Sequence, residues 1–432
     1  MSHIPGAAEA ARRIARGETT AAALLESVAA RMAAEEPRVR AYAALGLEAA
    51  RRRAAELDRA APQGPLHGVP IAVKDVFDTA ELPTAYGSAI WAGHRPRADA
   101  AAVALAHAAG AVMIGKTVTT EFASYTPGPT ANPHDVARTP GGSSSGSAAA
   151  VAAGMTCAAF GTQTAGSIIR PAAYCGVVGY KPSFGVIPRA GMKPLAESFD
   201  AAGTLGPGVA DAALLAAVAA GRPDLVAPEA PESWPVIGLL RTDWWDEAEP
   251  AQRVALEDLA RALARAGARI VELPRPGIAW ANERHSEAMA WEVARAFAWE
   301  RAEASALFSP KFAEICARGL AITPHGHAAI RADLQRARAV LSALFDRCDL
   351  VLTPSAPGEA PLGLSATGAP VFNRIWSLLG GPCLSLPCGR GPNGMPLGAQ
   401  LAAPPGQDAA LLGAALRVET VATQAFGGIG LR

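Results

Sequence analysis

The sequence predicts an α/β fold in which helices cover both faces of one large, mostly parallel β-sheet. Segments with strand character alternate with helical segments along the whole chain, and this alternation favours parallel strands joined by helices. The clearest example runs from residue 235 to residue 274, where two apolar strand segments flank a helical one. With 432 residues, half of them hydrophobic, the chain can bury a substantial core without a disulfide or a metal.

Residues 1–60 have the Ala-rich, amphipathic pattern of helices that pack against a larger domain. Either Thr19 or Thr20 can cap the helical segment AAALLESVAARMAAEE, because a threonine hydroxyl accepts a hydrogen bond from a free N–H group of the first turn. Pro37 predicts the end of that helix, since proline lacks an N–H group and collides with the preceding turn. We therefore expect a packing segment here rather than a site.

Residues 65–200 are the expected core of the domain and contain the candidate chemistry. The stretch GPLHGVPIAVKDVFD has two turn signals followed by apolar β-branched residues, so we expect a strand over residues 69–76. The next expected elements are a helix over 99–109 that ends at Gly110, a strand over 111–114, and a helix from Ser147 to about Ala153.

Residues 201–432 are expected to complete the sheet and its helical cover. We expect strands over 235–240 and 269–274, a helix over 252–267, a mostly helical region over 283–347, and two buried strands, DLVLTPSAP and CLSLPCG, each ended by proline. The proline-rich stretch 223–235 has the composition of a loop rather than of a hinge between independent domains. The whole chain, 1–432, is therefore interpreted as one domain.

Composition and charge argue against several classes of partner. Acidic and basic residues balance at 39 each, which argues against a polyanion such as nucleic acid. The six cysteines form no C-x-x-C pair, so neither a zinc site nor a secreted disulfide framework is indicated, and we expect a reducing cytoplasm. The N-terminus lacks the basic-then-apolar order of a signal peptide, and no run reaches the ~18 apolar residues of a membrane span.

One motif matches a phosphate-binding loop by its spelling. GAVMIGKT, residues 110–117, fits the pattern G-x-x-x-x-G-K-T. Its four intervening residues are apolar strand formers preceded by a helix, whereas a phosphate-binding loop follows a strand and leads into a helix. Backbone N–H groups cannot cradle phosphate while they pair in a sheet. We therefore interpret this segment as a junction between a helix and a strand.

A second motif, GSSSG at residues 142–146, fits the G-x-S-x-G elbow of an α/β-hydrolase esterase with Ser144 at its centre. A helix follows it, but the loop-like segment TANPHDVARTP precedes it in place of the strand that such an elbow needs. The elbow also requires a histidine partner. His285, His325 and His327 lie downstream in contexts more typical of surface or capping residues, so the esterase remains an alternative.

A third set of residues combines a lysine with two serine-rich segments. Ser167 in TQTAGSIIRP follows a glycine, which leaves its hydroxyl unhindered. The N–H groups of Thr164, Ala165 and Gly166 can turn towards one point as an oxyanion hole. A serine nucleophile needs a base, and without a credible histidine the remaining residue able to serve is a buried lysine. Lysine occurs at only five positions, and Lys74 lies within a predicted strand.

Lys74 and Asp75 are neighbours in that strand, so their side chains point to opposite faces and the carboxylate need not neutralise the ammonium. To act as a base near neutral pH, the Lys74 amine must lower its pKa from about 10.4 to about 7, a differential interaction of about 4 kcal/mol that burial can supply. Taken alone, Lys74 is interpreted more simply as an edge-of-strand lysine that reaches solvent.

Taken together, these segments resemble the amidase signature family. The likeness rests on PLHGVPIAVKD, NPHDVARTPGGSSSGS, CGVVGYKPSFG and FNRIWSLLGGPCLSLPCG, and it spans residues 65–389. The resemblance implies a single α/β domain with a large mixed, mostly parallel sheet and a Ser–cis-Ser–Lys triad. In that triad Lys74 is the base, Ser143 the bridging serine in a cis peptide, and Ser167 the nucleophile. The two serines are separated by 24 residues (167 − 143), the interval usual in the family.

Around the nucleophile the chain departs from the family pattern D-x-G-G-S-I-R-x-P. Gln163 stands at the aspartate position, and Arg170 follows Ser167 by three residues instead of two. This variant is similar to malonamidase and its relatives, where the arginine binds a substrate carboxylate, so Arg170 and Gln163 are substrate-binding candidates. The other interpretation of Arg170 is a brace that holds the loop through backbone carbonyls.

The resemblance implies an amidase that hydrolyses a small carboxamide through an acyl-enzyme on Ser167. The backbone N–H groups of Thr164, Ala165, Gly166 and Ser167 would form the oxyanion hole, and no metal or organic cofactor is expected. The expected partner is a small amide substrate that carries a carboxylate if it follows malonamidase. Some family members are instead amidotransferase subunits that pass ammonia to a partner, and a degenerate member could be only a binding scaffold. A homodimer is a further open alternative.

Overall fold

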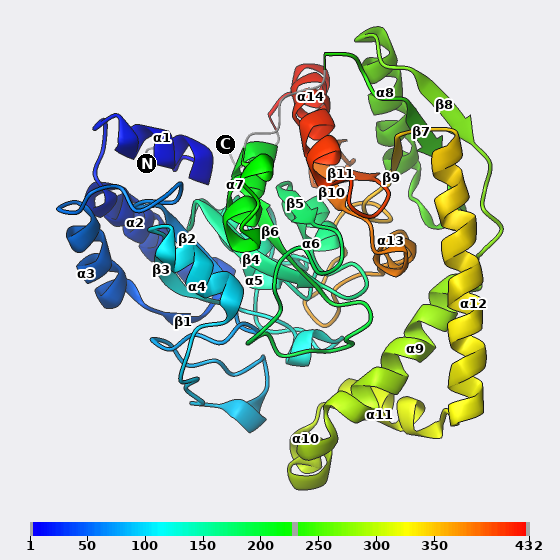
Figure 1. Ribbon diagram of the computed structural model, residues 1–432, viewed down its shortest axis with the longest axis horizontal. Helices are drawn as coiled ribbons and strands as arrows, with labels where there is room; N and C mark the ends of the chain where they lie inside the picture. Colours follow the sequence, from blue (N-terminus) through cyan, green and yellow to red (C-terminus); the bar gives the residue numbers. More distant parts are fainter. Residues whose placement is uncertain (1–2, 227–231, 429–432) are drawn as a thin grey trace.

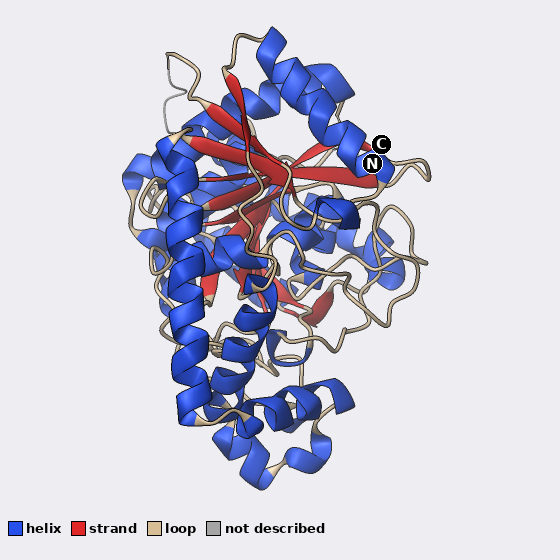
Figure 2. Cartoon of the chain, turned by 90° about the vertical axis from the view of Figure 1, so that its right-hand side faces the viewer, coloured by secondary structure: helices blue, strands red, loops and turns tan. Residues whose placement is uncertain are grey.

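A mixed β-sheet of 11 strands runs through the molecule, and helices cover both of its faces (Figures 1 and 2). The computed structural model describes residues 3–226 and 232–428 of the chain. The strands in these residues are β1 Tyr42–Leu45, β2 Pro70–Lys74, β3 Val112–Thr117, β4 Ala158–Gln163, β5 Val178–Lys181, β6 Ala201–Gly206, β7 Ile237–Leu240, β8 Ile270–Leu273, β9 Leu350–Pro354, β10 Cys383–Arg390 and β11 Pro396–Ala402. Their order across the sheet is β1-β3-β2-β4-β6-β5-β10-β11-β9-β7-β8, so the α/β class and the mixed sheet are confirmed.

The helices form an N-terminal packing group, a cover over the sheet and an arm beyond it. The α-helices of the described residues are α1 Ala7–Ala15, α2 Ala21–Val39, α3 Leu47–Leu57, α4 Ala101–Ala108, α5 Ser145–Ala152, α6 Ile169–Cys175, α7 Val209–Ala220, α8 Pro250–Arg265, α9 Ala281–Ala296, α10 Ala298–Glu303, α11 Pro310–Ala321, α12 Pro324–Ala343, α13 Arg374–Leu379 and α14 Asp408–Phe426. Short 3₁₀ helices are η1 Ala89–Trp91, η2 Glu121–Ala123, η3 Pro223–Leu225, η4 Trp245–Glu247, η5 Ser305–Leu307 and η6 Leu344–Asp346.

The sheet is less parallel than the sequence predicts. In the described residues six strand pairs are antiparallel and four are parallel. The parallel pairing of β7 with β8 confirms the strand–helix–strand interpretation of residues 235–274. Strands β4, β5, β6 and β11, each of which pairs antiparallel with at least one neighbour, are buried along their whole length. Their sequences therefore lack the alternation of apolar and polar residues that identifies a strand with one solvated face.

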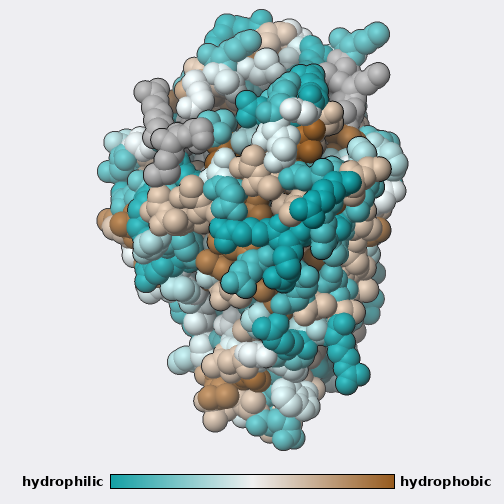
Figure 3. Space-filling model, turned by 90° about the vertical axis from the view of Figure 1, so that its left-hand side faces the viewer, coloured by the Kyte–Doolittle hydropathy of each residue, from teal (hydrophilic) through white to brown (hydrophobic). Residues whose placement is uncertain are grey.

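The N-terminal packing segment contains α1, α2, α3 and the edge strand β1. Thr20 caps α2, because its hydroxyl accepts a hydrogen bond of 3.1 Å from the Ala23 N–H group. The prediction that Pro37 ends this helix is wrong, since α2 continues to Val39. Pro37 has no N–H group to donate to the Ala33 carbonyl. Both residues are exposed, so water can bind that carbonyl instead. The outer face of the segment is largely hydrophilic (Figure 3).

Two strands extend past their predicted ends. β3 runs to Thr117 rather than to Ile114. β10 passes through Pro387 and ends at Arg390, so the prediction that proline ends this strand is wrong. Pro387 lies beyond the part of β10 that pairs with β5, and the pairing with β11 shifts register between Pro387 and Gly389. A residue without an N–H group is tolerated at such an irregularity.

Helices α9 to α12 form an arm that projects beyond the sheet (Figure 1), which confirms the mostly helical character predicted for residues 283–347. Aromatic side chains fill the interior of the arm: Phe122 lies 4.7 Å from Phe297 and 4.9 Å from Phe312 between ring centroids. Part of the loop predicted over 223–235, residues 227–231, lies outside the described residues.

Gly146 in α5 is a position where the packing requires glycine. A Cβ atom there would lie 2.2 Å from the Ala41 carbonyl oxygen and 2.4 Å from the Val118 nitrogen, both backbone atoms. Gly146→Ala is therefore expected to lower the free energy of unfolding by about 2–3 kcal/mol, measured by urea denaturation. In the control Gly326→Ala the nearest atom is the Thr323 hydroxyl at 3.3 Å. That variant should change stability by less than about 1 kcal/mol, and equal effects of the two changes would contradict the packing argument.

Candidate active site

Lys74 is the last residue of β2, and β2 lies between β3 and β4 in the sheet. Its side chain is fully buried, so the interpretation as a lysine that reaches solvent is wrong. The Lys74 Nζ atom lies 2.7 Å from Ser143 Oγ and 2.7 Å from Thr162 Oγ1. Thr162 belongs to the neighbouring strand β4, so two segments far from Lys74 in the sequence supply the groups around its amine.

The surroundings of Lys74 disfavour its charged form. Burial lowers the pKa of the amine well below its usual value of 10.5, because the protein cannot replace the water around an ammonium ion. Asp200 is the acid whose charge opposes this shift. Asp75 instead forms an ion pair with Lys116, with Oδ1 3.0 Å from Nζ. This pairing agrees with the prediction that Asp75 does not neutralise Lys74.

Ser143 lies in the loop between Gly141 and the start of α5. The peptide bond between Gly142 and Ser143 is cis, as the family resemblance implies, and Gly141 has φ of 83°, a conformation that favours glycine. Ser143 is 1% exposed, and its hydroxyl lies at hydrogen-bond distance from Lys74. The tertiary structure therefore brings Lys74 and Ser143 together.

Ser167 lies in the loop between β4 and α6. The Ser144 N–H group donates a hydrogen bond of 3.2 Å to the Ser167 carbonyl, which joins the two serine-rich segments side by side. Ser167 is 8% exposed, and its hydroxyl has no hydrogen-bond partner among the described residues. The N–H groups of residues 164–167 likewise donate to no described residue, which leaves them free for a bound group.

Gln163 and α13 hold this loop. Gln163 Oε1 accepts hydrogen bonds from the N–H groups of Ile168 and Ile169, at 3.0 and 3.1 Å. Its Nε2 group donates to Ser377 Oγ at 3.2 Å, and Ser377 donates to the Ala165 carbonyl at 3.0 Å. Gln163 is 1% exposed, so this arrangement favours a role in holding the loop over contact with substrate.

Three further residues near the loop, Thr162, Asp200 and Asn373, are not among the candidates predicted from the sequence. A Cβ atom on Gly166 would lie 2.5 Å from Asn373 Oδ1, so Asn373 packs directly against the loop backbone. Thr164 Oγ1 donates a hydrogen bond of 2.5 Å to Asp200. Burial raises the pKa of Asp200 to about 6. Thr162 begins the segment TQTAGSIIRP that contains Ser167, and Asn373 lies in the segment FNRIWSLLGGPCLSLPCG, whereas Asp200 lies in neither.

Arg170 in α6 is buried at 4% exposure. Its Nη2 group donates to the Gly142 carbonyl at 2.7 Å and to Thr367 Oγ1 at 3.1 Å, so the guanidinium does brace the loop that holds Ser143. Its Nε and Nη1 atoms are buried without a partner among the described residues. Burial lowers the pKa of Arg170 to about 10, so the side chain stays charged at neutral pH.

Residues 110–117 match the sequence pattern of a phosphate-binding loop but do not form such a loop. Its G-K-T part lies in β3 and is buried in the sheet. Lys116 Nζ is occupied by Asp75, by the Phe77 carbonyl at 2.9 Å and by Thr84 Oγ1 at 2.6 Å. The interpretation as a helix-to-strand junction is confirmed.

Residues 142–146 do not form the nucleophile elbow of an esterase either. Ser144 is fully buried, and its hydroxyl is held by the Thr162 backbone, with 3.3 Å to the carbonyl oxygen and 3.2 Å to the nitrogen. His285 is buried rather than at the surface, contrary to the prediction, because it packs on the Phe199 ring at 4.3 Å. Burial lowers the pKa of His285 to about 3. His327 stacks on Trp291, and His325 is exposed.

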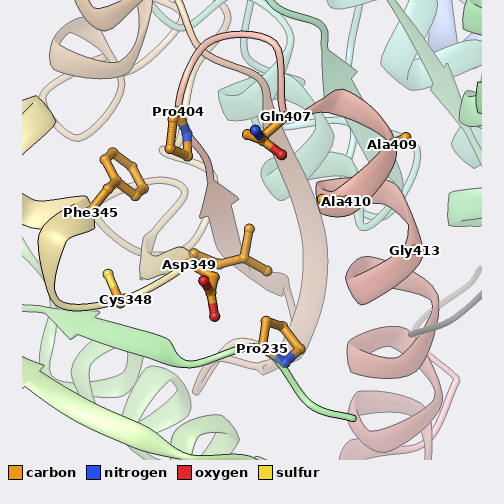
Figure 4. Close-up of a pocket in the computed structure, with 10 residues that line it drawn as sticks. Pro235, Phe345, Cys348, Asp349, Pro404, Gln407, Ala409, Ala410 and Gly413 are labelled. Carbon is orange, nitrogen blue, oxygen red and sulfur yellow. The ribbon is translucent and has the colours of Figure 1, made fainter. Parts of the chain in front are cut away.

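A pocket of about 400 Å³ lies elsewhere, between β9 and the N-terminal part of α14 (Figure 4). Its lining includes Cys348, whose pKa burial raises to about 11, and Asp349, which accepts a hydrogen bond of 2.7 Å from the Val236 N–H group. None of the candidate site residues lines it. Within residues 3–226 and 232–428, no group of three or more His, Cys, Asp or Glu side chains is arranged to hold a metal ion.

Comparison with known proteins identifies relatives over almost the whole chain. A family model described as Amidase matches residues 23–412. The chain is 32% identical to a glutamyl-tRNA(Gln) amidotransferase subunit of Koribacter versatilis, over 93% of this chain and 95% of that protein. It is 33% identical to the 2-amino-5-chloromuconic acid deaminase of Comamonas testosteroni, over 98% of this chain and 97% of that protein.

A solved structure described as an amidase has the same fold, with a TM-score of 0.88 and 34% identity over 95% of this chain and 99% of that chain. In the part of the chain that the structure describes, no helix combines the length and the apolar composition needed to cross a membrane.

Proposed function

Because the chain belongs to the amidase family, we propose that it hydrolyses a small carboxamide to a carboxylate and ammonia or an amine through an acyl-enzyme on Ser167. The observation that carries this proposal is the buried amine of Lys74, which lies 2.7 Å from Ser143 Oγ and forms no ion pair with a described acid. Burial lowers the pKa of this amine well below its usual value, which favours the neutral form that can accept a proton, and arginine could not replace it there.

In the proposed reaction the Ser167 oxygen attacks the carbonyl carbon of the amide. Ser143 takes the Ser167 proton and passes its own proton to neutral Lys74. The C–N bond of the tetrahedral intermediate then breaks, while the proton returns through Ser143 to the leaving nitrogen. Water attacks the acyl-enzyme by the same relay, which releases the carboxylate and restores the Ser167 hydroxyl.

The proposed oxyanion hole consists of the backbone N–H groups of Thr164, Ala165, Gly166 and Ser167. Their lack of partners in the described residues supports this role, because an oxyanion hole must present free donors before the charge develops. Gln163 and Asn373 would keep the loop in this conformation through the contacts described above. These residues position the loop and do not themselves react.

The proposed substrate carries a carboxylate in addition to its amide. The two unpartnered nitrogens of buried Arg170 support this, since a guanidinium binds carboxylates with strong charge-assisted hydrogen bonds. The deaminase relative, named for an acid substrate, favours the same class.

A hydrolysis screen tests the proposal. Ammonia release is measured for small amides with and without a second carboxylate, such as malonamate and propionamide. We expect wild type to prefer malonamate and Arg170→Ala to lose at least about 10-fold more kcat/KM on malonamate than on propionamide. Equal losses on both amides would mean that Arg170 only braces the loop, and no hydrolysis of any amide by wild type would refute the amidase.

A component of an amidotransferase that releases ammonia for a partner is the second candidate, favoured by the relatives whose names place them in such an enzyme. The two candidates differ in their requirement for a second polypeptide. An amidase hydrolyses its amide as a purified single chain, whereas an amidotransferase component co-purifies with a partner from its native cells. All six cysteines are free and buried, which supports a reducing, cytoplasmic setting for either function.

A further inference from the structure

Asp200 lies at the same edge of the sheet as the candidate catalytic residues. It directly precedes β6, and β6 pairs antiparallel with β4 so that Ala201 lies opposite Gln163. Lys74 is the last residue of β2, which pairs parallel with β4 on the other side. The end of β2, the end of β4 and the start of β6 therefore meet at one edge, where Lys74, the loop with Ser167 and Asp200 come together.

Two threonines connect Asp200 with Lys74. Thr162 Oγ1 lies 2.7 Å from Lys74 Nζ, and Thr164 Oγ1 donates a hydrogen bond of 2.5 Å to Asp200 Oδ1. The two threonines are only two residues apart, and two residues of chain span at most about 7 Å. The buried amine and the buried carboxylate are therefore held by neighbouring side chains at the end of the same strand.

The Asp200 carboxylate is buried and fully bonded, but the described residues do not neutralise it. Asp200 is 3% exposed, and its Oδ2 atom accepts hydrogen bonds from the N–H groups of Leu195 and Ala196, at 2.7 and 3.0 Å. Arg189 donates to the backbone carbonyl of Asp200 at 3.3 Å rather than to its carboxylate, although its charge favours the ionised form. Burial raises the pKa of Asp200 to about 6, so the carboxyl group is mainly ionised at neutral pH.

The other titratable groups beside this pair add no opposing charge. Asp75, next to Lys74 in sequence, forms its ion pair with Lys116. His285 on α9 lies against the ring of the residue before Asp200, and burial lowers the pKa of this histidine to about 3, so it is neutral. In the described part of the chain, Asp200 is the charged group that acts on the Lys74 amine.

A base that is buried without a counter-charge holds a proton poorly. In the proposed reaction Lys74 accepts a proton through Ser143 and then returns it, so its ammonium form must exist for part of each cycle. Burial disfavours that form, whereas a nearby negative charge stabilises it. A base transfers protons most effectively when its two forms are close in free energy at the working pH. An ionised Asp200 can therefore act on the chemistry without contact with the substrate.

We propose that Asp200 is a positioning residue for this reaction: its carboxylate anchors Thr164 at the head of the oxyanion loop, residues 164–167, and its negative charge stabilises Lys74 while Lys74 carries the proton. Thr164 is the residue at which the loop leaves β4, so this anchor fixes the first of the unused N–H groups. The inference rests on the proposed amidase function, because it assigns Asp200 a role in that reaction.

The first test is Asp200→Asn, which removes the charge and can keep the contacts. The carboxamide oxygen can accept from the N–H groups of Leu195 and Ala196, while its NH₂ group donates to the Thr164 hydroxyl, which accepts as well as donates. Without the negative charge the Lys74 amine should lose its proton at lower pH. We expect the rise of kcat/KM with pH to move about 1 pH unit lower, and kcat on the plateau to fall about 10-fold with KM changed by less than about 3-fold. A lower kcat with an unshifted pH profile would refute the role of the charge.

Asp211→Asn is the matched control. Asp211 is also buried, and it accepts hydrogen bonds from the N–H groups of Ala8 and Gly208 at 2.9 and 3.0 Å. It lies in α7, beyond the opposite end of β6 from Asp200. Its removal should leave the pH profile in place. Equal shifts in the two variants would show that the loss of any buried carboxylate moves the profile, which would contradict the assignment to Asp200.

The anchor is tested separately at Thr164. Thr164→Val removes the hydroxyl at similar volume, so the loop loses its bond to Asp200 and kcat should fall about 10-fold. Thr164→Ser keeps the hydroxyl and should recover most of this loss. A valine variant with the kcat of wild type would refute the anchor.

Labelling of Ser167 by a fluorophosphonate probe separates this inference from the proposed function, because labelling requires the base but no amide bond. If wild type is labelled yet hydrolyses no amide, and Asp200→Asn moves the pH dependence of labelling to lower pH, the amidase is refuted and the role of Asp200 stands. If wild type hydrolyses amides and Asp200→Asn shifts neither profile, the role of the Asp200 charge alone is refuted. A wild-type protein that does neither reaction would refute both.

Discussion

Lys74→Arg and Lys74→Ala are both expected to lose at least about 1000-fold of the wild-type kcat/KM near neutral pH. Alanine removes the base, and arginine keeps a positive charge that cannot accept a proton from Ser143. The buried amine lies 2.7 Å from both Ser143 Oγ and Thr162 Oγ1, and neither hydroxyl can take over its role as a base. Steady-state kinetics on the best amide of the screen measures the effect.

Two controls accompany the Lys74 variants. Lys311→Arg changes an exposed lysine whose Nζ group donates to the Ser365 carbonyl, and it should leave activity unchanged. Lys74→Met should be inactive but folded, because methionine fills the buried space without a charge. An arginine variant at position 74 that retains most of the activity would show that the amine is not a base.

The pKa of Lys74 also predicts a pH dependence with a definite sign. Its value in the folded protein is well below the usual 10.5, so the unfolded chain binds one proton more at pH values between the two. Its contribution to the free energy of unfolding therefore rises with pH across this window and is constant above 10.5. Activity should rise with pH as the folded amine loses its proton. The free energy of unfolding of Lys74→Met, taken relative to wild type, should therefore fall as the pH rises across this window, because only wild type gains stability there.

Ser167→Ala is expected to abolish both hydrolysis and covalent labelling by a fluorophosphonate probe. The probe phosphorylates an activated serine oxygen, and Ser167 is the serine whose hydroxyl has no hydrogen-bond partner in the described part of the chain next to unused N–H groups. Activity should fall by at least about 1000-fold, and mass spectrometry of wild type should locate the adduct on the peptide that contains Ser167.

Ser144→Ala is the matched control for this prediction. Ser144 lies in the esterase-like pattern, but it is fully buried and bonded to the Thr162 backbone, so its removal should leave the labelling intact. An adduct on Ser144 would favour the α/β-hydrolase alternative. A folded wild-type protein that the probe does not label at all would favour the binding scaffold without catalysis.

Local signals in the sequence were sufficient for much of the fold. The strand–helix–strand unit at residues 235–274, the helical arm and the cap at Thr20 all follow from periodicity, turn chemistry and capping, which act within a few residues. The same signals wrongly predicted that Pro37 ends its helix and that Pro387 ends its strand. Whether a missing N–H group ends an element depends on the groups that lie beside it in the folded protein.

The sequence by itself determined which residues are the candidates for chemistry. Lys74 in a strand, the glycine-rich serine segment and the loop with Ser167 are recognisable from residue types, and the resemblance to the amidase signature family selects Ser143 and implies the roles of all three residues. Only the tertiary structure decided how these residues are surrounded: Thr162 beside the amine, Asp200 at Thr164, and Asn373 against Gly166. The physical reason is that a side chain is buried and hydrogen-bonded by segments that can lie more than 200 residues away in the sequence. No local sequence pattern encodes those contacts.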